Sequence, residues 1–255
     1  MAHQQQDSHE HHHHHHDHGD HGDHEHGHGE PATHDDWLKY WEQGEDDWEH
    51  SIVDQFLIKY LDRLTAGNKR ATILVPLCGT SVDIKWLCEQ GYKVVGVELA
   101  EAAAKLFFTK YKLEYKVTTA DNGLTVYEGF NGNLKYVVGD FFVFNKDMYG
   151  TFDCLWDLNS FDPINKDDKQ RYVDHCHSLL KPNGPILLGS YIFDDHYCGP
   201  MPVTLDTIQS LYGNKFTVEH LELTDITMVM RDTIKDVEWK PNKIEETVFI
   251  MTRKN

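Results

Sequence analysis

Short apolar runs alternate with amphipathic segments along most of this chain. Ala71–Leu77 and Tyr92–Leu99 are almost continuously apolar, which is typical of strands buried on both faces of a sheet. The dipeptide Asn131-Gly132 between two alternating segments predicts a β-hairpin. The full set of predicted strands is Ala71–Leu77, Tyr92–Leu99, Thr125–Phe130, Asn133–Val138, Phe152–Asp157, Ile186–Phe193, Phe216–Leu223 and Thr247–Thr252.

Helical periodicity separates several of these strands. Ser51–Leu64 places Ile52, Phe56, Ile58 and Leu61 near one helical face. Further helices are predicted at Ser81–Gln90, Glu101–Tyr111, Asp167–Leu180 and Thr204–Leu211. Strands that alternate with helices indicate an α/β fold, with a mostly parallel, doubly wound sheet and helices on both faces.

The composition changes near residue 34. Residues 1–34 hold 14 of the 19 histidines, including the run His11, His12, His13, His14, His15 and His16, and they contain no Lys or Arg. A segment without an aliphatic stripe cannot bury enough apolar surface to fold. We therefore predict a disordered His/Asp/Gly-rich tail over 1–34 and one folded domain over 35–255. The tail imidazoles can bind a divalent metal adventitiously, and no metal site is predicted in the domain.

Charge and cysteine content exclude several classes of protein. The chain carries 42 acidic and 24 basic residues, a net charge of −18, which disfavours binding to nucleic acid or anionic lipid. No apolar run approaches the length of a membrane span, and the first residues are polar rather than signal-like. Five cysteines without CxxC spacing indicate free thiols. We expect a cytoplasmic protein that has no membrane or nucleic-acid partner.

The candidate chemistry lies where predicted strands end. Gly79 lies in the turn that follows the first strand, Glu98 ends the second strand, and Asp140 and Asp157 follow later strands. In an open α/β sheet, ligands bind beyond the carboxyl ends of the strands. An acid about 20 residues after the first turn is placed to accept hydrogen bonds from ribose hydroxyls. The chain has neither GxGxxG nor a P-loop, so nucleotide hydrolysis is not indicated.

These features and the turn LLKPNG before a strand resemble a class I S-adenosylmethionine-dependent methyltransferase. Longer stretches resemble the thiopurine S-methyltransferase family, from about Trp37 to Lys254. They are Trp37-x-x-x-Trp41-x-x-Gly44-x-x-x-Trp48, PLCGTSVDIKWL, GYKVVGVELAE, FDCLWD and SYIFDDHYCGPMPVTLDTIQSLYG. The resemblance implies a Rossmann-like sheet of seven strands with an antiparallel last strand, and S-adenosyl-L-methionine as cofactor.

The resemblance also implies roles for individual residues. Trp37 and Trp41 belong to a segment that folds over the cofactor, and Trp48 contacts both cofactor and substrate. Leu77 and Gly79 line the cofactor in the first turn. Glu98 and Leu99 hold the ribose and flank the adenine, and Asp140 and Phe141 lie at the adenine end. Leu158 stands where the family has an arginine next to the substrate, and Asp157 is a candidate for orienting the thiol or the cofactor's amine.

The predicted activity is methyl transfer from S-adenosylmethionine to a small aromatic or heterocyclic thiol, by a protein expected to be a monomer. A thiolate is a good nucleophile without a strong protein base. Cys78 is expected to be a buried apolar residue, and His175 and His177 to be structural. Two alternatives remain: a methyltransferase for halide, hydrosulfide, selenium or tellurium acceptors, and a metal-buffering protein with an inactive methyltransferase body.

Overall fold

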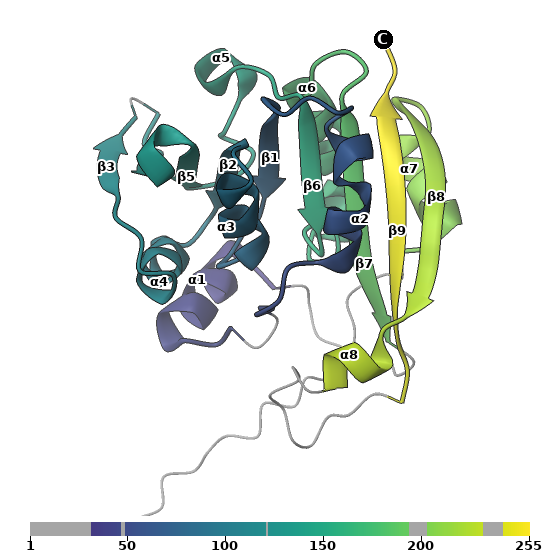
Figure 1. Ribbon diagram of the computed structural model, residues 1–255, viewed down its shortest axis with the longest axis horizontal. Coiled ribbons are helices and arrows are strands. Elements are labelled where there is room, and N and C mark those ends of the chain that lie inside the picture. Colours follow the sequence, from purple (N-terminus) through teal and green to yellow (C-terminus); the bar gives the residue numbers. More distant parts are fainter. Residues whose placement is uncertain (1–31, 47–48, 121, 194–202, 232–241) are drawn as a thin grey trace, which may run out of the picture.

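The computed structural model of this chain describes residues 32–46, 49–120, 122–193, 203–231 and 242–255. Within this part of the chain, one sheet has the strand order β3-β4-β5-β2-β1-β6-β7-β9-β8 (Figure 1). Its strands are β1 (Thr72–Pro76), β2 (Lys93–Glu98), β3 (Lys116–Thr119), β4 (Thr125–Gly129), β5 (Leu134–Val138), β6 (Cys154–Leu158), β7 (Pro185–Phe193), β8 (Phe216–Asp225) and β9 (Ile244–Arg253).

The middle of the sheet is parallel. The pairs β2–β5, β1–β2, β1–β6 and β6–β7 are all parallel, whereas β9 runs antiparallel to both β7 and β8. The seven strands from β5 to β8 therefore have the predicted architecture with an antiparallel last strand. At the other edge, β3 and β4 add an antiparallel extension. The short, exposed strand β3 carries no apolar run, which explains why the hydrophobic pattern does not predict it.

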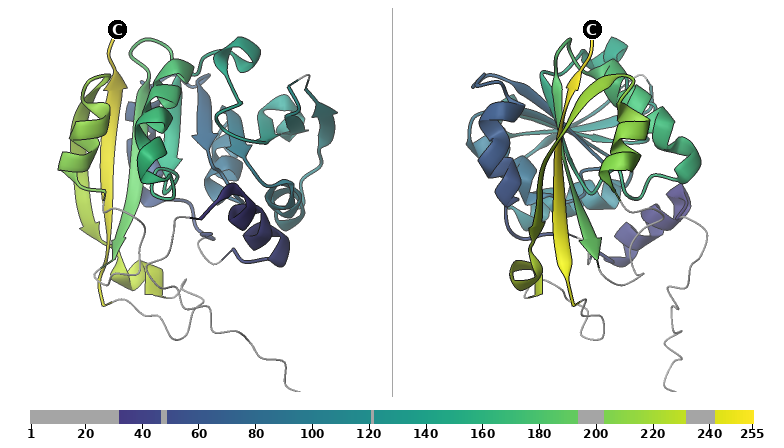
Figure 2. Two further views of the ribbon diagram at one scale, coloured as in Figure 1. Left: turned by 180° about the vertical axis from the view of Figure 1, so that it is seen from behind. Right: turned by 90° about the vertical axis from the view of Figure 1, so that its right-hand side faces the viewer.

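Helices cover both faces of the sheet (Figure 2). They are α1 (His34–Gln43), α2 (Gln55–Leu64), α3 (Val82–Glu89), α4 (Glu101–Lys110), α5 (Lys146–Tyr149), α6 (Lys169–Leu179), α7 (Leu205–Tyr212) and α8 (Thr227–Arg231). Two short 3-10 turns, Phe130–Gly132 and Lys166–Asp168, complete the set. Helices α2, α3 and α4 pack on one face, and α6 and α7 pack on the other.

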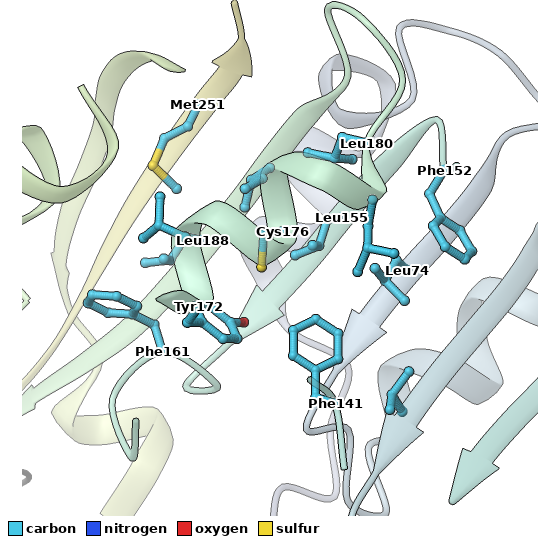
Figure 3. Packing of buried hydrophobic residues seen from close by; sticks show 14 of the residues in the cluster. Leu74, Phe141, Phe152, Leu155, Phe161, Tyr172, Cys176, Leu180, Leu188 and Met251 are labelled. Atoms are coloured by element: carbon cyan, nitrogen blue, oxygen red, sulfur yellow. The ribbon is translucent and has the colours of Figure 1, made fainter. Parts of the chain in front are cut away.

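Both faces of the parallel strands are buried, because successive side chains point to opposite sides. In β1, Ile73 and Val75 pack against the layer of α2 to α4, whereas Leu74 packs under α6. Figure 3 shows Leu74, Leu155, Leu188 and Tyr172 in the second of these cores. Burial on two sides is the reason why these strands read as continuous apolar runs.

The start and the buried face of α2 differ from the prediction. The helix begins at Gln55 rather than near Ser51, because Asp54 caps it and accepts hydrogen bonds from the N–H groups of Phe56 and Leu57. Ile52 and Ile58 are half exposed, and the buried positions are Phe56, Leu57 and Leu64. The prediction that Ile52 and Ile58 belong to the buried face of this helix was therefore wrong.

The predicted hairpin is confirmed with a wider turn. β4 and β5 pair antiparallel from Thr125↔Val138 to Gly129↔Leu134, so four residues connect them. Phe130, Asn131 and Gly132 all have positive φ angles, which suits an Asn-Gly dipeptide.

The structure does not describe residues 1–31, which make up most of the predicted tail and include the histidine run His11–His16, nor does it describe Trp48. The described helices are all too short or too polar to cross a membrane.

Candidate active site

The candidate site lies at the carboxyl ends of β1, β2 and β6, where the parallel strands finish side by side. Its floor is the turn Pro76–Ser81 between β1 and α3. Two residues of this turn, Leu77 and Gly79, have φ angles of 46°. This left-handed conformation disfavours most side chains, and glycine adopts it without a steric penalty. The strained backbone is therefore part of the turn itself, as expected where a ligand approaches closely.

Tyrosine hydroxyls hold this turn from two sides. Tyr136 in β5 donates to the carbonyl of Gly79 at 2.7 Å, and Tyr111 after α4 donates to the carbonyl of Thr80 at 2.9 Å. Ser160 after β6 donates to the carbonyl of Pro76 at 2.7 Å. These bonds keep the turn rigid. Sequence reasoning missed the three residues, because their partners are backbone atoms far away along the chain.

Glu98 is buried at the end of β2 and touches the glycine turn directly. Its Oε2 accepts from the N–H of Gly79 at 3.0 Å, and its Oε1 accepts from the N–H of Ala100 at 3.1 Å. Burial raises the pKa of Glu98, and the backbone N–H donors oppose this shift. Gly79 and Glu98, which the sequence analysis placed separately at the candidate site, are thus in contact, and Leu99 follows directly as a partly buried residue.

A second carboxyl group, that of Glu49, contacts the turn at Gly79 and Thr80. Its Oε2 accepts from both the N–H and the Oγ1 of Thr80, at 3.1 and 2.9 Å, and its Oε1 lies against Gly79. Burial, and to a smaller degree the charge of Glu98, raise the pKa of Glu49 to about 7. Sequence reasoning did not single out Glu49. The one hint in the sequence was that Glu49 follows Trp48, which belongs to the segment predicted to contact the cofactor.

The N-terminal segment does fold over the glycine turn. The ring of Trp41 in α1 lies 3.1 Å from the point where a Cβ on Gly79 would stand, and Trp41 is buried with Ala100 and Ala103. Trp37 is partly buried on the same helix, with its ring 5.7 Å from that of Tyr40. The structure thus places Trp41 at the turn, and Trp37 one helical turn before it.

Asp140 and Phe141 follow β5 in the neighbouring loop. Asp140 Oδ1 accepts from the N–H of Phe142 at 2.8 Å, which is a turn-capping contact. The Phe141 ring points into the core toward Tyr172 (Figure 3), and it also packs against His175. The side chain of Phe141 is 7% exposed, so little of its ring is available to a ligand.

Asp157 and Leu158 end β6. Asp157 is fully buried, with Oδ1 accepting from the N–H groups of Ser160 and Phe161 and Oδ2 accepting from Tyr172 Oη at 2.7 Å. Burial raises its pKa to about 6. These three donors bind Asp157 to the loop that follows β6. Leu158 is partly exposed. Its Cδ1 lies 3.0 Å from the point where a Cβ on Gly189 in β7 would stand.

Cys78, His175 and His177 all have packing or backbone contacts in the structure. Cys78 is buried, and burial raises the pKa of its thiol, as expected for an apolar packing residue. His175 contacts the carbonyl of Phe141 at 2.8 Å, and His177 packs against Phe216. Among the described residues, no group of three or more His, Cys, Asp and Glu side chains is arranged to hold a metal ion.

Known proteins are similar to this chain over almost the whole domain. Thiopurine S-methyltransferase from Bos taurus is 29% identical over 226 residues, covering 87% of this chain and 90% of that protein. A probable thiopurine S-methyltransferase from Danio rerio is 27% identical and covers 86% and 94% of the two chains.

Solved structures share the fold at lower identity. The 1,6-didemethyltoxoflavin-N1-methyltransferase of Burkholderia thailandensis, solved with S-adenosylhomocysteine, has a TM-score of 0.55 at 16% identity and covers 87% of each chain. The [4+2]-cyclase SpnF has a TM-score of 0.57 at 12% identity, over 88% of this chain and 98% of that one.

The family description "Thiopurine S-methyltransferase (TPMT)" matches residues 32–254, which include the glycine turn, Glu98 and the covering segment described above. The chain therefore belongs to the thiopurine S-methyltransferase family.

Proposed function

We propose that this protein transfers the methyl group of S-adenosylmethionine to the sulfur of a small aromatic or heterocyclic thiol. The observation that carries the proposal is the contact between Glu98 and Gly79, because it joins the acid after β2 to the turn after β1. An acid in this place is suited to bind the hydroxyl groups of a ribose. Membership in the family supports sulfur as the methyl acceptor.

The residues at the turn fit a cofactor of this kind. Each carboxylate oxygen of Glu98 accepts one backbone bond, and a carboxylate has about four acceptor positions, so ribose hydroxyls have acceptor sites left. Glu49 and Glu98 together give the turn a negative field, which favours a cofactor that carries a sulfonium and an ammonium group. The ring of Trp41 packs against the turn at Gly79.

Bound S-adenosylmethionine supplies a methyl group on a positively charged sulfur, which leaves as a neutral thioether. The protein's contribution is then mainly to position the two sulfur atoms, and orientation of this kind lowers a barrier by up to ~7–11 kcal/mol. The turn Pro76–Ser81 and Glu98 hold the cofactor. The end of β6, with Leu158, borders the place of the acceptor.

The acceptor that we propose is neutral. Leucine at position 158 offers neither charge nor hydrogen-bond donors, in contrast to the arginine that the family pattern implies. Nearby carboxyl groups would repel an anionic acceptor. A neutral thiol is therefore preferred to a carboxylated one.

The proposal is tested in two steps with the full chain. Calorimetric titration with S-adenosylmethionine measures cofactor binding, and a screen of thiols, hydrosulfide, iodide and selenide measures methyl transfer. We expect micromolar-range cofactor affinity, or about −8 kcal/mol, and methylated aromatic thiols as the products. Cofactor binding with methyl transfer only to iodide, hydrosulfide or selenide would instead favour a methyltransferase for inorganic acceptors.

A further inference from the structure

His50 is the residue of the N-terminal segment that reaches the acceptor side of the site. It follows Glu49, whose carboxyl group binds Thr80 in the turn after β1. The imidazole ring of His50 packs edge-to-face on the ring of Tyr191 in β7, with 5.0 Å between the ring centroids and 77° between the ring planes. Two adjacent residues therefore contact the ends of two different strands.

The strand that lies between these two contacts is β6. The sheet has the order β1-β6-β7, and Leu158, the last residue of β6, pairs with Gly189, two residues before Tyr191. The N–H of Tyr191 also donates to Oδ1 of Asn159, the residue after Leu158, at 3.0 Å. Because Cα atoms of adjacent residues are only about 3.8 Å apart, the segment crosses the carboxyl end of β6 just where His50 is placed. His50 thus lies beside the place that Leu158 borders.

Both ring nitrogens of His50 are available to a ligand. Neither has a hydrogen-bond partner among the described residues, and His50 is only partly buried, so its nitrogens are not sealed off. Burial, and to a smaller degree the charge of Lys110, lower the pKa of His50 to about 4, so the imidazole is neutral near pH 7. A neutral imidazole has one nitrogen that accepts a hydrogen bond and one that donates.

The other polar candidate at this end of β6 is already occupied. Asp157 accepts from the N–H groups of Ser160 and Phe161 with one oxygen and from Tyr172 Oη with the other. It is also fully buried, whereas His50 is partly exposed. His50 is therefore the better placed proton acceptor for a molecule that lies against Leu158.

We propose that His50 binds and deprotonates a ring N–H group of a heterocyclic acceptor, in which this N–H stands next to the carbon that bears the sulfur. The inference rests on the proposed methyl transfer to sulfur. In such an acceptor the neutral form is a thione, so the proton that has to leave is on nitrogen rather than on sulfur. Tyr191 acts as a positioning residue, because its ring holds the imidazole in place.

The step balances in atoms and charge. The thione sulfur forms a bond to the methyl carbon, and the electron pair of the broken carbon–sulfur bond remains on the leaving thioether. The positive charge passes to the methylated ring, which makes its N–H acidic, and the proton then moves to His50 and on to water. A weak base is enough for this transfer, because the N–H becomes acidic and the sulfonium charge near the imidazole disappears in the same step.

The first test compares H50F with H220F in methyl transfer to pyridine-2-thione, which has a ring N–H beside its C=S group, and to thiophenol, which has none. Phenylalanine keeps an aromatic ring against Tyr191 but has no nitrogen. His220 is a matched control because it also packs on an aromatic ring, that of Phe249 at 4.6 Å, and lies in the edge strand β8. The dissociation constant of S-adenosylmethionine, measured by calorimetry, reports whether each variant is folded.

We expect H50F to lose about 100-fold in kcat/KM for pyridine-2-thione, the usual contribution of a positioned base. Thiophenol should keep most of its rate, because it ionises in solution and needs no base from the protein. H220F should behave like the wild type with both acceptors. An equal loss with both acceptors would mean that His50 is only structural, and it overturns the inference, as does an unchanged rate with pyridine-2-thione.

The second test measures acceptor binding without methyl transfer. Pyridine-2-thione is titrated calorimetrically into protein saturated with S-adenosylhomocysteine, and H50F should bind it about tenfold more weakly, the usual effect of one lost hydrogen bond. Equal affinity in H50F and the wild type overturns the inference. Methyl transfer to thiophenol but not to pyridine-2-thione in the wild type overturns the inference and leaves thiol methylation intact. Absence of methyl transfer to any thiol, with the cofactor bound, overturns the proposed function and the inference with it.

Discussion

Individual carboxyl groups decide what this site can bind. Glu98 is buried and Glu49 is partly buried at the same turn, and their partners differ: backbone N–H groups for Glu98, and Thr80 for Glu49. We therefore expect the two acids to have separate tasks, so that substitution of each affects a different property of the cofactor complex.

Glu98→Ala is expected to weaken S-adenosylmethionine binding by about 1–3 kcal/mol, because charge-assisted hydrogen bonds to the ribose are lost and their partners stay buried. Calorimetry measures the change. Glu101→Ala is the control, since Glu101 is exposed on α4 and bonds to Tyr127. An unchanged dissociation constant in Glu98→Ala would contradict the ribose assignment.

Glu49→Gln should discriminate between cofactor and product. S-adenosylmethionine carries one positive charge more than S-adenosylhomocysteine, so loss of the Glu49 charge should weaken the former by about 1 kcal/mol more than the latter. The measurement belongs at about pH 8, because the pKa of Glu49 is about 7 and the group must be ionised. Equal changes for both ligands would show that Glu49 does not sense the sulfonium.

Leu158→Arg should shift the acceptor preference toward carboxylated thiols. A guanidinium at this position lies near Glu246 Oε1, so it adds donors and also neutralises the nearest carboxyl group. The ratio of kcat/KM for a thiobenzoic acid to that for thiophenol should rise, by up to about a hundredfold. Leu158→Met, which conserves volume, is the control. If the wild type already prefers the carboxylated thiol, another residue must bind the carboxylate.

At the scale of secondary structure, α1 connects the covering segment to the domain. Thr33 caps this helix, and Thr33 and Asp36 form a reciprocal capping box, with the N–H of Thr33 donating to Asp36 at 2.8 Å. Thr33 and His34 thus take part in this helix start, just before the predicted domain boundary at residue 35. Because α1 places the Trp41 ring next to Gly79, we expect the stability of this helix to affect cofactor binding.

Removal of residues 1–31 should leave Tm and cofactor affinity unchanged, because their composition offers no apolar stripe for packing. Removal of residues 1–34 takes the cap as well and should cost about 1 kcal/mol, the usual value of an N-cap. Thermal unfolding and calorimetry of both truncations measure the difference. Thr33→Ala in the full chain should reproduce the effect of the longer truncation; identical behaviour of the two truncations would show that the cap is unimportant.

For the whole molecule, acids with raised pKa values make the folded state less stable as the pH rises. Burial raises the pKa of Glu49 and Asp83 to about 7 and that of Glu246 to about 10. The folded protein then binds more protons than the unfolded chain, so stability falls as pH rises through these values. His50, His175 and His177 have lowered pKa values and oppose this trend only below about pH 6.5.

We expect Tm to fall between about pH 6.5 and about pH 9, by some 2–4 °C for each kcal/mol lost. Calorimetric or fluorescence melting at constant ionic strength measures the slope. Glu246→Gln should flatten the upper part of the curve, whereas Glu245→Gln should not. A constant or rising Tm over this range would mean that the buried acids are solvated or paired in solution.

The sequence by itself determined the α/β class, most strands and helices, and the position of the glycine turn with Glu98. These features depend on local patterns: runs buried on two faces, helical periodicity, and an acid at the end of a strand. The sequence did not predict β3, because this short exposed strand has no apolar run. It predicted the wrong buried face for α2, because the helix begins only after the cap at Asp54, and tertiary packing buries Phe56, Leu57 and Leu64.

Only the tertiary structure decided which acids are buried together and which aromatic rings face the core. Glu49 lies against Gly79, and Asp54, Asp83 and Glu246 are all buried, although each looks like an ordinary surface acid in the sequence. Phe141 is adjacent to Asp140 along the chain, yet it points into the core. Burial and pairing depend on long-range packing, and one sequence contains no local signal for them.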